Sequence, residues 1–479
     1  MNAMTKWLGR TIAVGAAALL VLAGGAMAQG TASSGERIVI AQAEVASAPA
    51  DQAAPAAPAE AAAAPAAPKI DTGDTAWMLT SSALVLMMTI PGLALFYGGM
   101  VRKKNVLATL AQSFGATAII TVLWMVAGYS LALTPNPDAG TNAFIGGLSY
   151  LFLGPMGVNS TSSLAATIPE SVYMFFQMTF AIITPALIAG SFADRMKFSA
   201  FLWFMSLWLI LVYCPIAHWV WGGGWLGGLG ALDYAGGAVV HLNAGTAGLV
   251  TCIVLGKRHG YGTENMAPHN LALSVIGASL LWVGWFGFNA GSAVSSNVNA
   301  GMAAAATQIA TAAAALSWMA VEWVITKKPS VLGMISGAVS GLVAITPASG
   351  FVNAQGALAI GLIAGVVCYF SAVHMKRIFG YDDALDAWGV HGVGGALGAI
   401  LTGVFANSSV NMLGKGWLAD GNFGQIPIQI YAVVAVFVYC AIVTFIILKL
   451  IDAMIGLRVS RDVEIEGLDY NLHGETMHA

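Results

Sequence analysis

Apolar segments alternate with short polar connections from Asp74 to the carboxyl-terminal region of the chain. Each segment approaches or exceeds the roughly 20 residues that a helix needs to cross a hydrocarbon core about 30 Å thick. We therefore predict an all-α membrane protein with eleven transmembrane helices, at residues 75–99, 106–133, 171–192, 199–220, 236–256, 270–290, 300–325, 331–348, 355–374, 387–406 and 427–451.

The lysines and arginines of the connections test this count, because cytoplasmic connections retain positive charge. Every second connection carries them, and the intervening ones contain only Lys415. One span more or fewer would destroy the alternation, so the amino end is predicted outside and the carboxyl tail in the cytoplasm. The basic connections contain Arg102, Lys103, Lys104, Arg195, Lys197, Lys257, Arg258, Lys327, Lys328, Lys376 and Arg377, and the tail contains Arg458 and Arg461.

Each half of the predicted membrane domain has an odd number of spans, so the two halves have opposite orientations in the membrane. Five spans invert whatever follows them, so segments one to five and six to ten are predicted to form two inverted five-helix repeats, followed by a final helix. Transporters commonly have this arrangement.

Composition agrees with a membrane protein. The chain of 479 residues is 58% hydrophobic and 9% charged, against about 25% charged in soluble proteins. Its 57 glycines allow helices to approach closely in lipid. The four cysteines all lie in apolar segments and form no disulfide or metal pattern. We predict no cofactor, no metal and no nucleic-acid partner.

The amino-terminal region differs from the rest of the chain. Residues 1–28 combine a basic start, an apolar run and an Ala-Met-Ala sequence, as in a secretory signal peptide. Residues 29–73 are rich in alanine and proline and are predicted to be a disordered tether. The membrane domain is assigned to residues 74–452 and a cytoplasmic tail to residues 453–479.

Two histidines lie within the predicted spans. His241 ends the sequence Asp233-Tyr-Ala-Gly-Gly-Ala-Val-Val-His241, and His391 ends Asp386-Ala-Trp-Gly-Val-His391. Ionisable groups at membrane depth are costly, so they usually face a permeation path and have a partner. The Asp-to-His spacing is eight residues in one segment and five in the other. Contact between the rings requires that the aspartates lie deeper than the membrane interfaces.

Several long motifs resemble ammonium transporters of the Amt family, within the Amt/Mep/Rh superfamily. They occur in the family's order and cover the chain from Asp74 onward. They are Thr75-Ala-Trp-Met, Met88-Thr-Ile-Pro-Gly-Leu-Ala-Leu-Phe-Tyr-Gly-Gly-Met100, Ala217-His-Trp-Val-Trp-Gly-Gly-Gly224, Gly230-Ala-Leu-Asp-Tyr-Ala-Gly-Gly237, Gly284-Trp-Phe-Gly-Phe-Asn-Ala-Gly-Ser292, Ile345-Thr-Pro-Ala348 and Gly389-Val-His-Gly392.

The resemblance implies a role for ten residues. An outer site that recruits ammonium is expected at Phe176, Phe180, Trp221 and Ser292, and a gate of stacked rings at Phe180 and Phe288. His241 and His391 are expected to line a narrow hydrophobic pore, and Asp233, Asp386 and Thr346 to support these sites.

These residue types fit the chemistry of ammonium. A cation over aromatic faces gains about 2 kcal/mol when partly desolvated. An isolated ammonium ion in a medium of low dielectric costs tens of kcal/mol by Born estimates, whereas neutral ammonia carries no such penalty. We therefore expect deprotonation near the gate, passage of ammonia along the imidazoles and reprotonation inside. A neutral imidazole offers one donor and one acceptor nitrogen for this task.

Structural roles compete with the functional ones at three carboxylates. Asp233 precedes a predicted helix, so capping of that helix is the expected role, and Asp386 is expected to do the same for the tenth span. Glu322 lies inside the seventh span and needs a polar partner that the sequence does not reveal. His218, His259, His269 and His374 are expected to be ordinary packing residues.

The tail and the assembly follow from the resemblance alone. Residues 456–475 resemble the family's cytoplasmic tail, which helps to control conduction, and the family implies a homotrimer in the inner membrane and a PII-type nitrogen regulator as partner. Three alternatives stay open: an ammonium sensor that signals through its tail, a Rhesus-like gas channel, and an enzyme using a metal held by His241, His391 and a carboxylate. The enzyme is disfavoured because no clustered-ligand motif is present.

Overall fold

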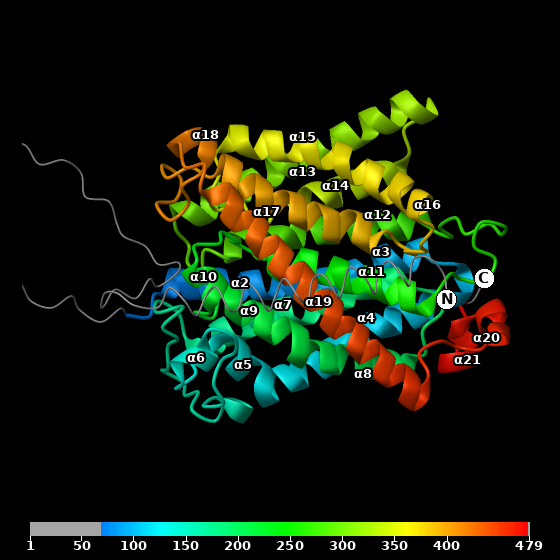
Figure 1. Ribbon diagram of the computed structural model, residues 1–479, viewed down its shortest axis with the longest axis horizontal. Helices are drawn as coiled ribbons and strands as arrows, with labels where there is room; N and C mark the ends of the chain where they lie inside the picture. The colour runs from blue at the N-terminus through cyan, green and yellow to red at the C-terminus, as the bar shows by residue number, and fades with distance from the viewer. Residues whose placement is uncertain (1–68, 478–479) are drawn as a thin grey trace, which may run out of the picture.

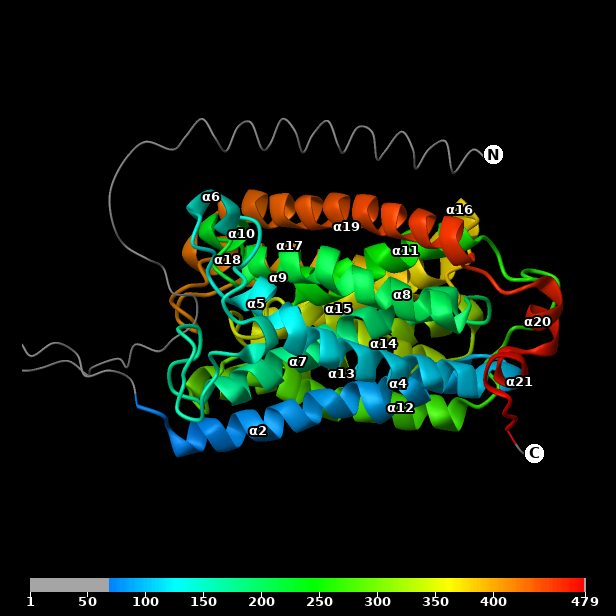
Figure 2. The same cartoon turned by 90° about the horizontal axis from the view of Figure 1, so that it is seen from below.

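A computed structural model describes residues 69–477. In this range the regular secondary structure consists of helices, apart from two isolated β-bridges. The predicted signal peptide and residues 29–68 of the predicted tether lie outside the described residues. The long helices run side by side along the longest axis of the molecule (Figures 1 and 2). One end of this bundle carries α6, α10 and α18, and is called the loop end. The other carries the last two helices, α20 and α21, and is called the tail end.

The α-helices have the following bounds. They are α2 (Thr72–Met87), α3 (Ala94–Met100), α4 (Val106–Leu123), α5 (Tyr129–Leu133), α6 (Ala139–Asn142), α7 (Glu170–Phe192), α8 (Phe198–Trp208), α9 (Cys214–Val220), α10 (Trp225–Gly228), α11 (Asn243–Leu255), α12 (Leu271–Trp285), α13 (Val298–Thr326), α14 (Val331–Ile345), α15 (Ala354–Phe370), α16 (Lys376–Phe379), α17 (Val393–Phe405), α18 (Trp417–Asp420), α19 (Gln425–Ile455), α20 (Arg461–Glu466) and α21 (Leu468–His473).

Ten helical segments of the described range are long and apolar enough to cross a membrane. The predicted segment 331–348 corresponds to α14, which is apolar but shorter. The ten are Thr72–Met100, Lys103–Leu133, Glu170–Phe192, Phe198–Gly228, Gly237–Leu255, Leu271–Ala290, Val298–Thr326, Ala354–Phe379, Trp388–Phe405 and Gln425–Ile455.

Many of these segments contain a π-helical turn, in which the chain widens by one residue. Such turns are rare and occur frequently at functional sites. Three of them carry residues of the predicted pore: Phe288 lies in η7, His241 in η6 and His391 in η9. The π-helical turns are η1 (Met88–Leu93), η3 (Trp124–Gly128), η5 (Leu209–Tyr213), η6 (Gly237–Leu242), η7 (Phe286–Ala290), η8 (Ser371–Met375) and η9 (Trp388–Gly392).

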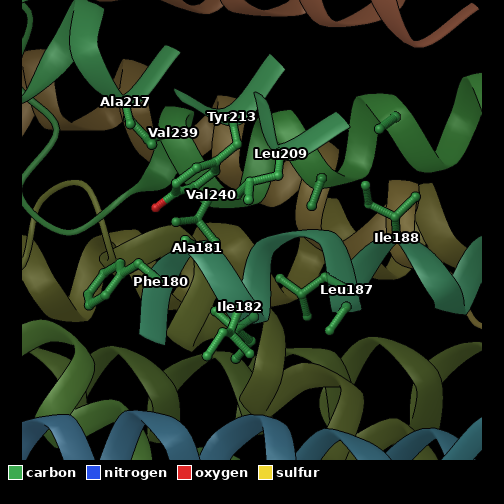
Figure 3. Packing of buried hydrophobic residues seen from close by; sticks show 14 of the residues in the cluster. Phe180, Ala181, Ile182, Leu187, Ile188, Leu209, Tyr213, Ala217, Val239 and Val240 are labelled. Atoms are coloured by element: carbon green, nitrogen blue, oxygen red, sulfur yellow. The ribbon is translucent and has the colours of Figure 1, made fainter. Parts of the chain in front are cut away.

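Helix α7 lies at the centre of the bundle and nearly all of its residues are buried. Figure 3 shows Phe180, Ile182 and Leu187 of this helix packed among Leu209, Val240 and other apolar residues of η5 and η6. Helix α19 crosses the other helices obliquely (Figure 1). The core therefore fixes the position of Phe180, the residue predicted to belong to both the recruitment site and the gate.

Glycines allow the two histidine segments, η6–α11 with His241 and η9–α17 with His391, to touch. A Cβ on Gly245 of α11 would lie 2.2 Å from the backbone nitrogen of Gly392, and a Cβ on Gly395 of α17 would lie 2.6 Å from the carbonyl oxygen of Gly237. Both separations are shorter than any real contact, so a side chain at either position would push the segments apart. The glycines place η6 and η9 side by side.

Polar side chains form hydrogen bonds with the groups at helix ends, and Glu322 has its polar partner at such an end. Its carboxylate accepts hydrogen bonds from the backbone nitrogen and the hydroxyl of Ser330, at 3.1 and 2.8 Å. Ser330 in turn caps α14 by accepting a bond from Gly333. The partner that the sequence did not reveal is therefore the start of the next helix.

The tail packs against connections at its end of the bundle. Arg458 pairs with the buried Glu464 at 2.7 Å, and Glu464 also accepts the backbone N–H of His259. Asp469 accepts the backbone N–H groups of Leu107 and Ala108, at 3.1 and 2.8 Å, so it caps the start of α4. The contacts join the tail to the connections that follow α3 and α11.

Candidate functional site

A cavity of about 530 Å³ opens at the loop end of the bundle. Phe180, Trp221 and Ser292, three of the four residues predicted to form the recruitment site, line it together with Asp233 and Gln177. The fourth, Phe176, is fully buried and packs edge-on against Phe180 with ring centroids 5.0 Å apart. Phe176 therefore supports the wall of the cavity from behind.

The polar groups of this cavity leave acceptors free for a cation. The indole N–H of Trp221 donates to the carbonyl of Asp233 at 2.9 Å. The hydroxyl of Ser292 donates to the carbonyl of Phe288 at 2.9 Å, which leaves its oxygen able to accept a bond from a ligand. The edge of the Trp221 ring meets Phe180 with centroids 5.9 Å apart. The cavity thus combines aromatic rings with a hydroxyl acceptor.

Two phenylalanine rings close the inner side of the cavity. Phe180 and Phe288 are stacked with their centroids 4.1 Å apart and their planes inclined by 24°. They are 1% and 0% exposed, so both rings are shielded from solvent. The ring of Phe288 continues the path, because its centroid is 5.9 Å from that of His241.

The two histidines meet in the interior. Their Nδ1 atoms are 3.3 Å apart, and the rings are stacked at 5.4 Å with an inclination of 21°. A contact between two nitrogens requires one to donate and the other to accept, so at most one ring carries a proton on Nδ1 when both are neutral. The Nε2 atom of His241 is buried and has no hydrogen-bond partner among the described residues. A small polar molecule therefore has a binding partner there.

The aspartate ahead of His241 caps its segment. The carboxylate of Asp233 accepts four backbone N–H bonds, from Gly236, Gly237, Ala238 and Val239, at 2.6 to 3.1 Å. Burial raises the pKa of this carboxyl, and the four N–H groups oppose the rise. The capping role predicted for Asp233 agrees with these bonds.

The corresponding prediction for Asp386 is wrong. Asp383, not Asp386, accepts the backbone N–H groups of Ala387 and Trp388 at 3.2 and 2.8 Å. The side chain of Asp386 instead pairs with the ammonium group of Lys376 at 2.5 Å. Asp386 has φ of 60°, a left-handed conformation that turns the chain into η9. Asp386 therefore shapes the turn and holds Lys376.

A tryptophan that the sequence did not single out completes the pore wall. Trp285 is stacked on His241 with centroids 5.2 Å apart and planes inclined by 20°. Its indole N–H donates to the hydroxyl of Thr346 at 2.9 Å, so Thr346 holds the Trp285 ring. The available signal was spacing, because Trp285 lies three residues before Phe288 and so shares its face of the helix.

The path continues toward the tail end beyond the histidines. A small cavity of about 50 Å³ borders His391 and is lined by Tyr97, Trp318, Ser336 and Asp386. In residues 69–477 there is no group of three or more His, Cys, Asp or Glu side chains suited to a metal ion.

Comparisons with known proteins agree with the geometry. The model of the Ammonium Transporter Family matches residues 76–478. An ammonium transporter of Bacillus subtilis (strain 168) is 51% identical over 403 residues, which is 84% of this chain and 98% of that protein. One of Aquifex aeolicus is 52% identical over 409 residues, 85% of this chain and 93% of that protein.

Solved structures share the fold. The crystal structure of Saccharomyces cerevisiae Mep2 superposes with a TM-score of 0.75 at 36% identity, covering 82% of this chain and 91% of Mep2. A structure described as a sensor Amt protein superposes with a TM-score of 0.76 at 26% identity, covering 84% of this chain and 98% of the sensor.

Proposed function

The chain belongs to the ammonium transporter family, and we propose that it recruits ammonium at the Phe180–Trp221–Ser292 cavity, deprotonates it and conducts ammonia between His241 and His391. The loop end faces the outside and the tail end the cytoplasm in this proposal. The distribution of lysine and arginine supports that orientation in the cytoplasmic membrane, with eleven spans and a signal peptide at residues 1–28.

Recruitment follows from the make-up of the cavity. The aromatic faces attract a cation, and the Ser292 oxygen accepts one of its N–H bonds. The capped carboxylate of Asp233 holds the cavity wall through its four backbone bonds and its carbonyl contact with Trp221. The ion is concentrated here while part of its water shell remains.

The observation that carries the mechanism is the closed path beyond this cavity. The Phe180–Phe288 stack and the buried histidine pair leave no room for a hydrated cation. An ion that sheds one proton at the stack becomes ammonia, which gains a hydrogen bond at each imidazole and crosses without the Born penalty of a charge. Ammonia then takes up a proton on the cytoplasmic side.

The ammonium sensor is the second candidate, because the tail contacts two connections of the bundle. A sensor would change its tail contacts on binding ammonium and carry little flux. The aromatic cavity favours recruitment of the cation over a Rhesus-like gas channel. Assembly as a homotrimer with a PII-type regulator at the tail end is a further part of this proposal, supported by family membership.

Current recording on the reconstituted protein tests the proposal. Ammonium pulses at several pH values are expected to give saturable transport with strong preference over potassium. A transient current would show that charge follows the ammonia, and uptake without current would show that the proton returns outside. Tail rearrangement without flux would contradict transport and support the sensor. Equal potassium flux would contradict the closed path.

A further inference from the structure

A second large cavity lies at the tail end, and Lys376 of its lining pairs with Asp386 of the small cavity beside His391. Its volume is about 520 Å³, and it lies between the connection that follows α11 and the segment from α16 to Ala384. Four cationic side chains line it, from Lys257, Arg258, Lys376 and Arg377. Glu264 is the only carboxylate among the lining residues. Retention of positive charge at cytoplasmic connections explains basic residues here, but not their convergence on one cavity.

Half of these cations already have partners. Arg258 pairs with Asp382 at 2.8 Å and Lys376 with Asp386 at 2.5 Å. The carboxylate of Glu264 lies 3.8 Å from Arg102 and 3.8 Å from His259, two side chains that do not line the cavity. In residues 69–477, neither Lys257 nor Arg377 has a carboxylate within ion-pair distance. Lys257 and Arg377 therefore line the cavity without a paired carboxylate, although Glu264 lies in the same lining.

Tyr261 contacts Lys257 and offers a hydrogen-bond donor beside it. The ammonium group of Lys257 lies over the Tyr261 ring, 5.4 Å from its centroid, and 4.0 Å from where a Cβ on Gly380 would stand. Burial raises the pKa of the Tyr261 hydroxyl, so it keeps its proton at neutral pH. That hydroxyl makes only a long contact of 3.5 Å with the carbonyl of Tyr381 and is available as a donor.

We propose that this cavity binds a phosphate-bearing anion between Lys257 and Arg377. A phosphate monoester carries about two negative charges near neutral pH and the phosphodiester of a lipid headgroup carries one, so either is attracted to the two unpaired cations. Lysine and arginine are the side chains that proteins use most for such groups, and a planar guanidinium contacts two phosphate oxygens at once. The volume lies within the range of about 300 to 1,000 Å³ of small-molecule sites.

The phosphate can come from a soluble ester or from a lipid headgroup. Ile378 and Phe379, beside Arg377, are 77% and 61% exposed, so acyl chains have an apolar surface next to the cavity. The lining connection also holds the tail, because the carbonyl of Lys257 accepts a bond from Arg458 at 2.7 Å. An anion bound here therefore lies against the connection through which the tail is attached.

Calorimetric titration of the full-length protein in phosphatidylcholine nanodiscs tests the site with two soluble probes, inorganic pyrophosphate and ATP. A second arm replaces part of the lipid with phosphatidylglycerol and counts bound lipid by native mass spectrometry. The test variant is Lys257→Gln with Arg377→Gln. The matched control is Lys327→Gln with Lys328→Gln, which removes the same charge at the same end of the bundle but outside the cavity lining.

The wild type is expected to bind one probe saturably, with affinity reduced about tenfold for each cation removed from the cavity and unchanged in the control. Binding in the first arm identifies a soluble ester, and binding only of phosphatidylglycerol identifies a lipid headgroup. Absence of saturable binding in both arms would overturn the proposal, as would equal losses in the test and control variants. Size-exclusion profiles establish that both variants are folded.

Discussion

The two histidine segments are built on the same plan but in different electrostatic surroundings. Both His241 and His391 lie in a π-helical turn, and in both an aspartate eight residues earlier caps the segment. Asp233 accepts four backbone N–H bonds, whereas Asp383 accepts two. Around Asp383 lie Asp386 and Lys376, but Asp233 has no cation in ion-pair contact among the described residues.

The same kind of cap, an aspartate that accepts backbone N–H bonds, thus holds the histidine segments at both ends of the bundle. At the loop end the cap depends on backbone N–H groups, and no cation pairs with the capping carboxylate among the described residues. At the tail end the cap lies near the ion pairs of Arg258 with Asp382 and of Lys376 with Asp386. Each segment therefore delivers an imidazole to the same point, but the energy that holds it there comes from different sources.

Removal of each capping carboxylate breaks this comparison most directly. Asp233→Ala leaves four buried N–H groups without an acceptor and is expected to lower the free energy of unfolding by about 4 kcal/mol, against about 2 kcal/mol for Asp383→Ala. Loss of repulsion from Asp386 lessens the second effect further. Unfolding midpoints in detergent measure the difference.

Asp138→Ala is the matched control, since Asp138 caps the short exposed helix α6 through the backbone N–H of Thr141. Its cost should be smaller than that of either buried cap, because Asp138 is exposed to solvent. An equal or larger loss in Asp383→Ala than in Asp233→Ala would show that the ion pairs at the tail end, not the backbone bonds, dominate.

Replacement of the histidines themselves tests whether the two rings act together. His241→Ala and His391→Ala are each expected to lower the ratio of ammonium to potassium transport about tenfold or more, because each opens the dry passage and removes a hydrogen-bond partner. Flux assays in proteoliposomes measure this ratio. His218→Ala is the control: the two nitrogens of this buried ring lie 3.0 and 2.7 Å from the carbonyl oxygens of Ala132 and Asn142, away from His241 and His391.

The His218 variant should lose stability but keep its selectivity. Normal uptake with ammonium still preferred over potassium in both pore variants would refute the role assigned to the pair.

A pH titration separates the two capping aspartates. Burial, and then the charge of Asp386, raise the pKa of Asp383 to about 6, although Lys376 opposes the rise. The unfolded carboxyl ionises near its ordinary pKa of 3.8. Between these values the folded protein holds a proton that the unfolded chain has lost, so stability should fall as pH rises from about 4 to about 6 and level off above.

The melting midpoint of Asp383→Asn should lack this fall. Persistence of the same pH dependence in the variant would assign it to another group.

The sequence predicted the helices well because length and apolarity decide whether a segment can cross a membrane. Helix α2 begins at Thr72, three residues before the predicted start, and α14 is shorter than the ten helical segments that can cross a membrane. The sequence singled out His241 and His391 because a titratable side chain is costly to place in an apolar segment and usually serves a function there. Their contact was beyond prediction, because it depends on the close approach of Gly245 and Gly392 and on two π-helical turns.

The error over Asp386 has a different origin. The aspartate nearest to His391 was compared with Asp233, and the two spacings disagreed, while Asp383 lies at the same eight-residue distance as Asp233. Equal spacing was therefore visible in the sequence and would have assigned the cap correctly. The ion pair of Asp386 with Lys376 was not visible, because it depends on the left-handed turn at Asp386.

The smallest expected effect concerns a contact present on only one side of the histidine pair. Trp285 is stacked on His241 and is held by the hydroxyl of Thr346. Thr346→Val keeps the shape of the side chain but removes the acceptor, so the indole N–H is left buried and stability should fall by about 1 kcal/mol. The freed tryptophan should loosen the His241 ring and leave His391 unaffected, which ¹⁵N-histidine NMR of the two imidazoles resolves. Trp285→Phe removes the donor as well, so Thr346→Val in that background should cost less, since only the bond from the Thr346 hydroxyl to the carbonyl of Leu342 is then lost. Equal broadening of both imidazole signals in Thr346→Val would show that the two rings are coupled more tightly than their separate supports imply.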